Sequence, residues 1–205
     1  MGNEMLDEGV IKFQCDWHQD RAFTASRLQS LMAWRDRMYE LGLIGVGEDG
    51  IGFGNISMRW NNSFQFVISG TQTGNIAHLS PEGYTLVTQF NIPENRLTCV
   101  GPAKPSSESL THAAIYTYNT SVGGVIHVHH HQLWQQLLFS VPTTREEIPY
   151  GTPEMAQEIW RLFDYEDLMR YGILATAGHQ DGVIAVGRSL EAAAQVLLHY
   201  YKAIQ

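Results

Sequence analysis

The chain has 205 residues, enough to bury a core as a single domain without disulfides or structural metals. Hydrophobic residues make up 44% of the sequence and charged residues 17%, a composition typical of a globular protein. The net charge of −8 and the lack of a basic cluster in the sequence argue against nucleic acid as a partner. Cys15 and Cys99 are isolated, so the sequence predicts neither a disulfide framework nor a cysteine zinc site.

Residues 1–8 are acidic and polar, unlike a signal peptide, and no apolar run approaches the length of a membrane span. We therefore expect a cytoplasmic protein with no membrane partner. The low share of charged residues favours apolar surfaces that are covered in an oligomer.

Helices and strands are predicted in an irregular alternation. The first helix is expected to begin at a capping box over residues 26–29 and to end at Gly42. Strands are expected at residues 56–60, 64–69, 83–89, 97–100, 122–129, 171–177 and 182–186, with a hairpin turn at 61–63. Further helices are expected at residues 106–118, 132–139 and 153–170 and from 189 onward. This order lacks a regular βαβ rhythm and predicts a mixed sheet covered by helices.

The most informative strand carries His127 and His129. Alternate residues of a strand share a face, so these two imidazoles are expected to point the same way, with Cα atoms about 7 Å apart. Two imidazoles at this spacing can bind one divalent ion, whereas burying them without a metal or polar partner is costly. For the pair alone, a polar strand end beside a helix start is an equally good interpretation. His130 and His131 fall where the strand ends and are not predicted as ligands.

A catalytic metal site usually has three protein ligands and one open position. His179 is the best candidate for the third ligand because it follows a predicted strand at a turn that contains glycines. Asp181 is a candidate partner that orients one of the imidazoles.

Ser106, Ser107 and Glu108 are expected at a helix start. Hydroxyl groups and free backbone N–H groups at such a position favour an anion, although an ordinary helix cap has the same residues. A carboxylate beside a metal can also act as a general acid or base. Residues 45–50 match G-x-G-x-x-G in letters, but they follow a helix and contain two acidic residues, so we reject a dinucleotide site.

Together, these segments resemble the class II aldolase/adducin family. The resemblance extends from about residue 27 to the end of the sequence. It depends on an ordered set of segments at residues 34–43, 54–59, 69–74, 105–108, 125–129, 151–154 and 187–193.

The resemblance implies an α/β fold with three α/β/α layers around a mixed, mostly antiparallel sheet. The family domain would cover residues 27–205, preceded by an N-terminal extension over residues 1–26. The family also implies a homotetramer. For the activity, the resemblance implies a metal-dependent aldolase or lyase that acts on a small, phosphorylated ketose through an enediolate.

The resemblance also assigns roles to matched positions. Glu108 would be the catalytic acid/base. Zn²⁺ or another divalent ion would be bound by His127, His129 and His179. The substrate phosphate would be bound by Asn55, Ser69, Gly70, Ser106 and Ser107.

Two departures from the family pattern concern the site. His179 is followed by Gln180 and Asp181, where the family has His-Gly, and the stretch from His129 to Gly151 is shorter than in the family. In the aldolases this stretch carries a tyrosine that reaches the neighbouring subunit, and Tyr150 is the candidate to replace it. The alternatives are a sugar-phosphate epimerase, a dehydratase, or a non-catalytic interaction module like the adducin head domain.

Overall fold

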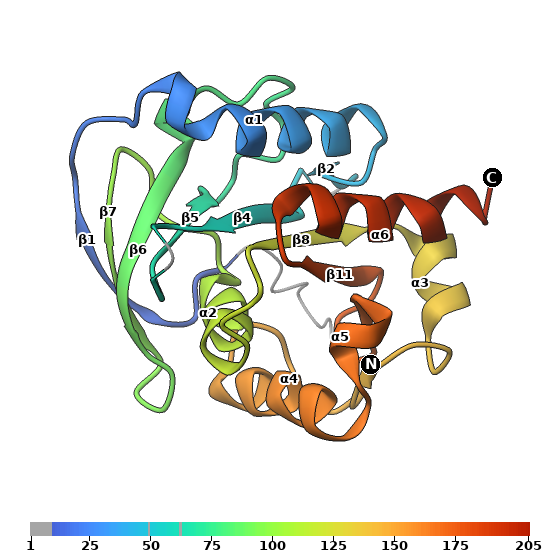
Figure 1. The fold of residues 1–205 in the computed structure, drawn as a ribbon. Helices are drawn as coiled ribbons and strands as arrows, with labels where there is room; N and C mark the ends of the chain where they lie inside the picture. The colour runs from blue at the N-terminus through green and yellow to red at the C-terminus, as the bar shows by residue number, and fades with distance from the viewer. Residues whose placement is uncertain (1–9, 49, 62) are drawn as a thin grey trace.

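The computed structural model describes residues 10–48, 50–61 and 63–205 (Figure 1). The helices are α1 (Ala25–Glu40), the 3₁₀ helix η1 (Pro81–Gly83), α2 (Ser109–Tyr118), α3 (His131–Leu137), α4 (Pro153–Tyr165), α5 (Leu168–Tyr171) and α6 (Leu190–Lys202). The strands are β1 (Gln14–His18), β2 (Gly45–Val46), β3 (Gly52–Phe53), β4 (Asn55–Arg59), β5 (Phe66–Ser69), β6 (Tyr84–Asn91), β7 (Arg96–Val100), β8 (Gly124–His129), β9 (Thr143–Thr144), β10 (Ile173–Thr176) and β11 (Gly182–Gly187).

Nine of the described strands form one sheet in the order β1-β7-β6-β5-β4-β8-β11-β10-β9. Neighbouring strands run antiparallel except at the two edges, where β1 pairs in parallel with β7 and β9 pairs in parallel with β10. Strands β2 and β3 form a separate small sheet. The expected α/β fold with a mixed, mostly antiparallel sheet is confirmed.

Alternate side chains of the central strands enter two different hydrophobic clusters. On β8, Ile126 and Val128 belong to one cluster and Val125 belongs to the other. The first cluster includes residues of α1 and α6, and the second includes residues of α2 and α4. Figure 1 shows α1 and α6 above the central strands and α2 and α4 below them. The sheet therefore has helices on both faces, as the two-residue period of its strands requires.

The ends of three predicted helices differ from expectation. Helix α1 begins at Ala25 with Thr24 as its N-cap, so the capping box expected at residues 26–29 is wrong. Helix α2 begins at Ser109 with Glu108 as its N-cap, which leaves Ser106 and Ser107 in the preceding loop. The single helix expected at residues 153–170 is two helices, because Asp167 has a left-handed backbone conformation with φ of 51° that interrupts the α-helix.

Four strands were not predicted from the sequence: β1, β2, β3 and β9. Strand β1 lies within the segment expected to be an extension, and it forms one edge of the large sheet. Its side chains alternate between exposed and half-buried, which is a weak hydrophobic signal. Asn62 of the expected hairpin turn and Asp49 of the rejected glycine motif lie outside the described residues.

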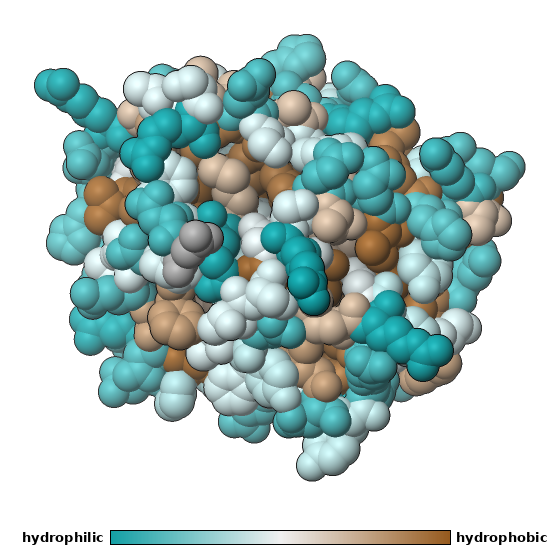
Figure 2. Space-filling view, viewed as in Figure 1, coloured by the Kyte–Doolittle hydropathy of each residue, from teal (hydrophilic) through white to brown (hydrophobic). Residues whose placement is uncertain are grey.

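The surface is mixed in character. Figure 2 shows hydrophobic residues on this face as separate brown groups among teal, hydrophilic ones. Within the part of the chain that the structure describes, no helix is both long and apolar enough to cross a membrane.

The sheet brings two distant parts of the chain to one place. The register of β8 with β11 sets His129 opposite Gly182, at the start of β11. The turn over residues 177–181, which joins β10 to β11, therefore lies beside the carboxyl end of β8. This end of the sheet carries the candidate site.

Strand β8 also packs closely against the start of α6. A Cβ atom on Gly124 would lie 2.5 Å from the Cα atom and 2.6 Å from the backbone nitrogen of Leu190. We expect Gly124→Ala to lower the free energy of unfolding by about 1–3 kcal/mol, because backbone atoms must move to admit the methyl group. Urea denaturation measures this change, and Gln195→Ala on the exposed side of α6 should change it by less than about 0.5 kcal/mol. Equal stability of Gly124→Ala and the unmodified protein would contradict the close contact.

Candidate metal centre and anion site

Strand β8 places His127 and His129 on the same face. Their Nε2 atoms are 2.9 Å apart, and their ring centroids are 4.9 Å apart. His127 is fully buried and His129 is half-buried. The structure therefore brings these two imidazoles together, with the Nε2 atom of each directed toward the other.

His179 joins the pair from the turn between β10 and β11. Its ring stacks on the ring of His127 with centroids 5.5 Å apart and meets the ring of His129 edge-on at 4.7 Å. One nitrogen from each of the three histidines lies within 4.8 Å of the others. The three side chains form a cluster that can hold one metal ion.

The turn that carries His179 is fixed by its neighbours. Thr176 Oγ1 lies 2.9 Å from the carbonyl oxygen of His179, and Trp134 Nε1 donates a 2.8 Å hydrogen bond to the carbonyl oxygen of Thr176. A Cβ atom at Gly178 would lie 2.4 Å from the carbonyl oxygen of Ile148, so only glycine allows this approach. The extra residues Gln180 and Asp181 do not displace His179 from the cluster.

Glu108 lies between the cluster and β4. Its carboxylate accepts a 2.9 Å hydrogen bond from Asn55 Nδ2 and lies 3.1 Å from His127 Nε2 and 3.6 Å from His179 Nδ1. Asn55 is on β4 directly opposite His127 on β8, so the strand register fixes both partners of this carboxylate. Asn55 and Glu108 are each only 5% exposed.

The protonation state of His127 suits a metal site. Burial lowers the pKa of His127 well below its ordinary value, and the neighbouring His129 and His179 lower it further. His127 is therefore neutral at physiological pH, and neutral imidazole is the form that binds a metal ion. Three imidazoles with a carboxylate in contact are a donor set that suits zinc and similar divalent ions.

The expected anion site lies beside Glu108, in the loop before α2. Ser106 and Ser107 are buried and line a narrow pocket of about 20 Å³ together with Asn55 and Gly70. Ser69 lies deeper, because its Oγ accepts a 3.2 Å hydrogen bond from the backbone nitrogen of Ile56. The narrow pocket shares Gly52, Thr71 and Gln72 with a larger cavity of about 790 Å³.

Helix α1 positions one wall of this anion site. The guanidinium group of Arg35 is only 1% exposed and donates to the carbonyl oxygens of Thr73 at 2.7 Å and Ala77 at 3.1 Å. These bonds fix the loop that follows Gly70 without placing the charge of Arg35 in the pocket.

His130, His131 and Asp181 lie outside the cluster. His130 is the N-cap of α3, where its Nδ1 accepts a 3.2 Å hydrogen bond from the backbone nitrogen of Leu133. His131 Nδ1 lies 2.7 Å from a carboxylate oxygen of Asp181. Asp181 thus holds an exposed imidazole and not one of the three clustered histidines.

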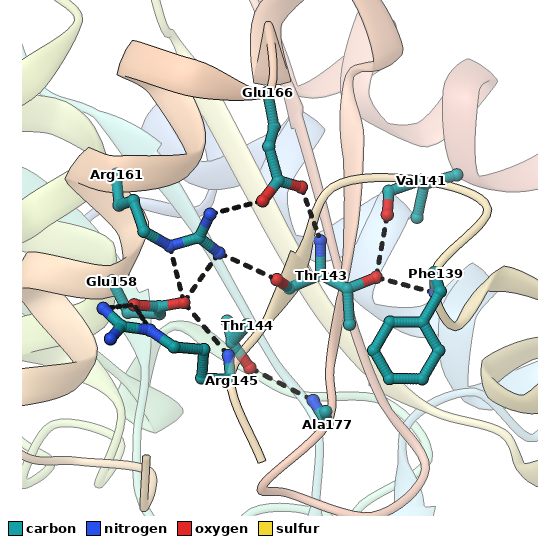
Figure 3. A network of polar contacts seen from close by, with 9 residues as sticks. All are labelled: Phe139, Val141, Thr143, Thr144, Arg145, Glu158, Arg161, Glu166 and Ala177. Atoms are coloured by element: carbon teal, nitrogen blue, oxygen red, sulfur yellow. Dashed lines mark hydrogen bonds and ion pairs between the residues drawn. The ribbon is translucent and has the colours of Figure 1, made fainter. Parts of the chain in front are cut away.

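The short stretch after His129 is held by a network around Glu158 (Figure 3). The buried Glu158 carboxylate accepts hydrogen bonds from the backbone nitrogen of Arg145 at 3.0 Å, from the Arg145 guanidinium at 2.8 and 3.0 Å, and from Arg161 Nε at 2.8 Å. Glu166 accepts from the backbone nitrogen of Thr143 at 3.2 Å, and Thr144 Oγ1 accepts from the backbone nitrogen of Ala177 at 3.1 Å. The network joins α4 to β9 and to the turn that carries His179.

Tyr150, near the end of the short stretch after His129, lies at the site. Its ring stacks on His179 with centroids 4.7 Å apart and an interplanar angle of 24°. The sequence placed Tyr150 near the site only through the family pattern, and the structure brings it against the predicted third ligand.

One buried polar group near the site was not predicted. His112 lies one turn after Glu108 on α2, and its Nδ1 is 2.7 Å from Ser57 Oγ, which is 2.9 Å from the hydroxyl group of Tyr116. Burial lowers the pKa of His112 to about 3, so this imidazole is neutral. The four-residue spacing from Glu108 places both side chains on one helix face, and this spacing is the signal that could have identified it.

Comparisons with known proteins identify the family of this chain. Residues 31–205 match the family described as Class II Aldolase and Adducin N-terminal domain. The chain belongs to the class II aldolase/adducin family.

Solved structures with a similar fold have several different names. YgbL from Klebsiella pneumoniae, whose proposed activity is aldolase, epimerase or decarboxylase, has a TM-score of 0.65 and 19% identity over 89% of this chain and 88% of its own. An L-fuculose 1-phosphate aldolase has a TM-score of 0.64 and 17% identity over 89% and 86%. A sugar-phosphate aldolase from Thermotoga maritima has a TM-score of 0.64 and 16% identity over 87% and 92%. At these identities the similarity establishes the fold, which this chain has in common with class II aldolases.

The Glu158 network predicts how stability depends on pH. Burial alone would raise the pKa of Glu158, but hydrogen bonds from Arg161 and Arg145 bring it below its ordinary value. This carboxylate therefore stabilises the fold above its unfolded pKa, and the contribution is lost as pH falls through the lowered folded pKa. We expect Glu158→Gln to lower the free energy of unfolding by about 2–3 kcal/mol at pH 7, with the deficit shrinking below about pH 4.

Urea denaturation at a series of pH values measures this difference. Glu94→Gln, at an exposed glutamate, is the matched control and should follow the unmodified protein. A deficit that stays constant from pH 7 to about pH 3 would show that the Glu158 charge does not stabilise the fold.

Proposed function

We propose that this protein is a divalent-metal-dependent aldolase or lyase that acts on a small, phosphorylated ketose through an enediolate. The observation that carries the proposal is the position of the buried Glu108 carboxylate, 3.1 Å from His127 Nε2 within a cluster of three histidines. A base in contact with a metal site is the arrangement that proton removal beside a carbonyl needs.

His127, His129 and His179 would hold the ion, with Zn²⁺ as the first candidate. When bound, a divalent ion acts as a Lewis acid that withdraws electron density from the carbonyl and hydroxyl groups of a ketose. Glu108 removes the proton from the substrate carbon next to the carbonyl group, which gives the enediolate. In the reverse direction Glu108 returns a proton to that carbon. The hydrogen bond from Asn55 Nδ2 to Glu108 holds this carboxylate toward the cluster.

The substrate phosphate would lie at Ser106 and Ser107, with Asn55 and Gly70 beside it. Their placement around one narrow pocket next to Glu108 supports this role. Ser69 would support the site through the backbone of β4, since its hydroxyl group binds Ile56.

We also propose the family's three-layer arrangement and its homotetramer. Helices on both faces of the sheet support the three layers. Phe139 and Tyr165 are each 82% exposed, and the exposure of such large apolar side chains supports the proposal that another copy covers them.

A non-catalytic module of the adducin type is less well supported. Such a module has no need to bury a carboxylate against three imidazoles, because burying these groups costs free energy unless they bind something. An epimerase or a dehydratase would use the same proton removal by Glu108.

Metal content tests the first part of the proposal. Protein purified without a histidine tag from metal-replete medium should contain about one divalent ion per chain by elemental analysis. His127→Ala and His179→Ala should lose it, because each removes a ligand. His131→Ala should retain it, because His131 binds Asp181 outside the cluster. Absence of metal from the unmodified protein would contradict the proposal.

Proton exchange tests the role of Glu108. In D₂O, the metal-loaded protein should incorporate deuterium into dihydroxyacetone phosphate, the smallest phosphorylated hydroxyketone, as followed by NMR. Glu108→Gln should slow this exchange by about 100-fold or more while retaining the metal, because the amide cannot accept the proton. Glu94→Gln is the control. Exchange at the unmodified rate in Glu108→Gln would exclude Glu108 as the base.

A further inference from the structure

A short segment before the family-matched region lines a cavity beside the candidate site. Val10 and Ile11 line the cavity of about 790 Å³, which adjoins the narrow pocket at Ser106 and Ser107. The family match begins only at residue 31, so this wall of the site comes from outside the matched region.

The main chain of this segment is held in place. Asn95 Nδ2 donates a 2.9 Å hydrogen bond to the carbonyl oxygen of Lys12, and the backbone nitrogen of Gln14 donates a 2.8 Å hydrogen bond to the carbonyl oxygen of Asn95. Phe13 is 6% exposed and belongs to the cluster that packs against α2 and α4. The main chain at Lys12 is therefore fixed by the hydrogen bond to its own carbonyl oxygen and by the contacts of the two residues that follow it.

The side chain of Lys12 reaches the ring that covers the third ligand. Its ammonium nitrogen lies 4.0 Å from the centroid of the Tyr150 ring, a cation–π distance. The same ring stacks on His179 with centroids 4.7 Å apart. One aromatic ring thus contacts both the ammonium group and a predicted metal ligand.

The stem of Lys12 also lies beside the expected anion site. A Cβ atom built on Gly151 would be 3.4 Å from the carbonyl oxygen of Ser107 and 3.7 Å from Cδ of Lys12. Lys12 and the loop of Ser106 and Ser107 therefore flank the same backbone turn, and rotation about the side-chain bonds of Lys12 can move its ammonium group toward that loop.

The residues that line this pocket provide no positive charge. Asn55, Gly70, Ser106 and Ser107 are uncharged, Glu108 beside them is a carboxylate, and the whole chain has a net charge of −8. The Glu108 carboxylate repels an anion in this pocket, and the divalent ion of the proposed function offsets part of that repulsion. Lys104 lines the adjoining cavity, with its ammonium nitrogen 5.7 Å from the centroid of the Trp17 ring. A lysine beside Ser107 would offset the repulsion further. Lysine is suited to this task because its ammonium is a compact charge on a flexible stem.

We propose that Lys12 is a substrate-binding residue of this site. Its ammonium group pairs with the anionic group, phosphate or carboxylate, that Ser106 and Ser107 hold, and it rests on Tyr150 when the anion is absent. This inference rests on the proposed function, because it assumes an anion at Ser106 and Ser107. It adds a residue from outside the family-matched region to the site.

Calorimetric titration with inorganic phosphate at low ionic strength tests the inference on the metal-loaded protein. Lys12→Met keeps most of the stem and removes the charge, and it should weaken phosphate binding by about tenfold. Lys12→Arg restores the charge and should bind within about threefold of the unmodified protein. Arg188→Met removes one charge from an exposed residue just beyond β11, at the end of this strand remote from His179, and should bind phosphate as the unmodified protein does.

Two further measurements separate this inference from the proposed function. The metal content of Lys12→Met should stay at that of the unmodified protein, which shows that the histidine cluster is intact. The double variant Ser106→Ala and Ser107→Ala should lose phosphate binding because it removes both hydroxyl groups. A parallel titration with malonate distinguishes a carboxylate substrate from a phosphate one, and loss of its binding in Lys12→Met supports the same pairing.

The outcomes are distinct. If Lys12→Met binds phosphate as tightly as the unmodified protein while the serine variant does not, Lys12 has no role in binding and the proposed anion site stands. If neither phosphate nor malonate binds the unmodified protein, the anion site of the proposed function fails and the Lys12 inference fails with it.

Discussion

The register of β8 between β4 and β11 is the constraint on which the candidate site depends. It sets Asn55 opposite His127 and Gly182 opposite His129. Asn55, which binds the Glu108 carboxylate, therefore meets the histidine pair and the turn of the third histidine at one end of the sheet. A slip of one residue would turn both histidines to the opposite face, into the cluster packed by α1 and α6. The buried apolar residues that alternate with the histidines oppose such a slip, since Ile126 and Val128 would then leave that cluster. The same packing that stabilises the sheet therefore also fixes the ligand geometry.

The third histidine depends on a different kind of support. The turn of His179 lies near the edge of the sheet, where β9 has only two residues and contributes little pairing. Hydrogen bonds from Arg145 and Arg161 to the buried carboxylate of Glu158 replace that pairing and hold the segment against α4 (Figure 3). These hydrogen bonds thus fix the shortened stretch after His129 beside the site. The stretch ends with Tyr150, whose ring stacks on His179.

The buried imidazoles near the site avoid mutual electrostatic repulsion. Burial keeps His127 and His112 neutral by lowering the pKa of each imidazole, which allows them to lie close to one another without repulsion. The carboxylate of Glu108 then lies between the histidine cluster and Asn55. Such a centre favours a divalent cation. The Glu108 carboxylate also borders the proposed anion pocket, which gives a basic residue beside that pocket, such as Lys12, a functional reason.

The sequence by itself determined the parts of the protein that local periodicity and short motifs encode. The two-residue period of β8 predicted the shared face of His127 and His129, and glycines marked the turn of His179. The irregular order of predicted strands and helices predicted the mixed sheet, and the family resemblance implied that it is mostly antiparallel. Tertiary structure alone decided the rest. Strand β1 has a weak alternation and is a strand because β7 offers a partner, and the helix predicted at residues 153–170 is broken by the left-handed conformation of Asp167. Lys12 and Tyr150 are 138 positions apart in the sequence, and their contact exists only because the chain folds. Local patterns cannot encode such a contact, because it depends on how distant segments pack around a common core.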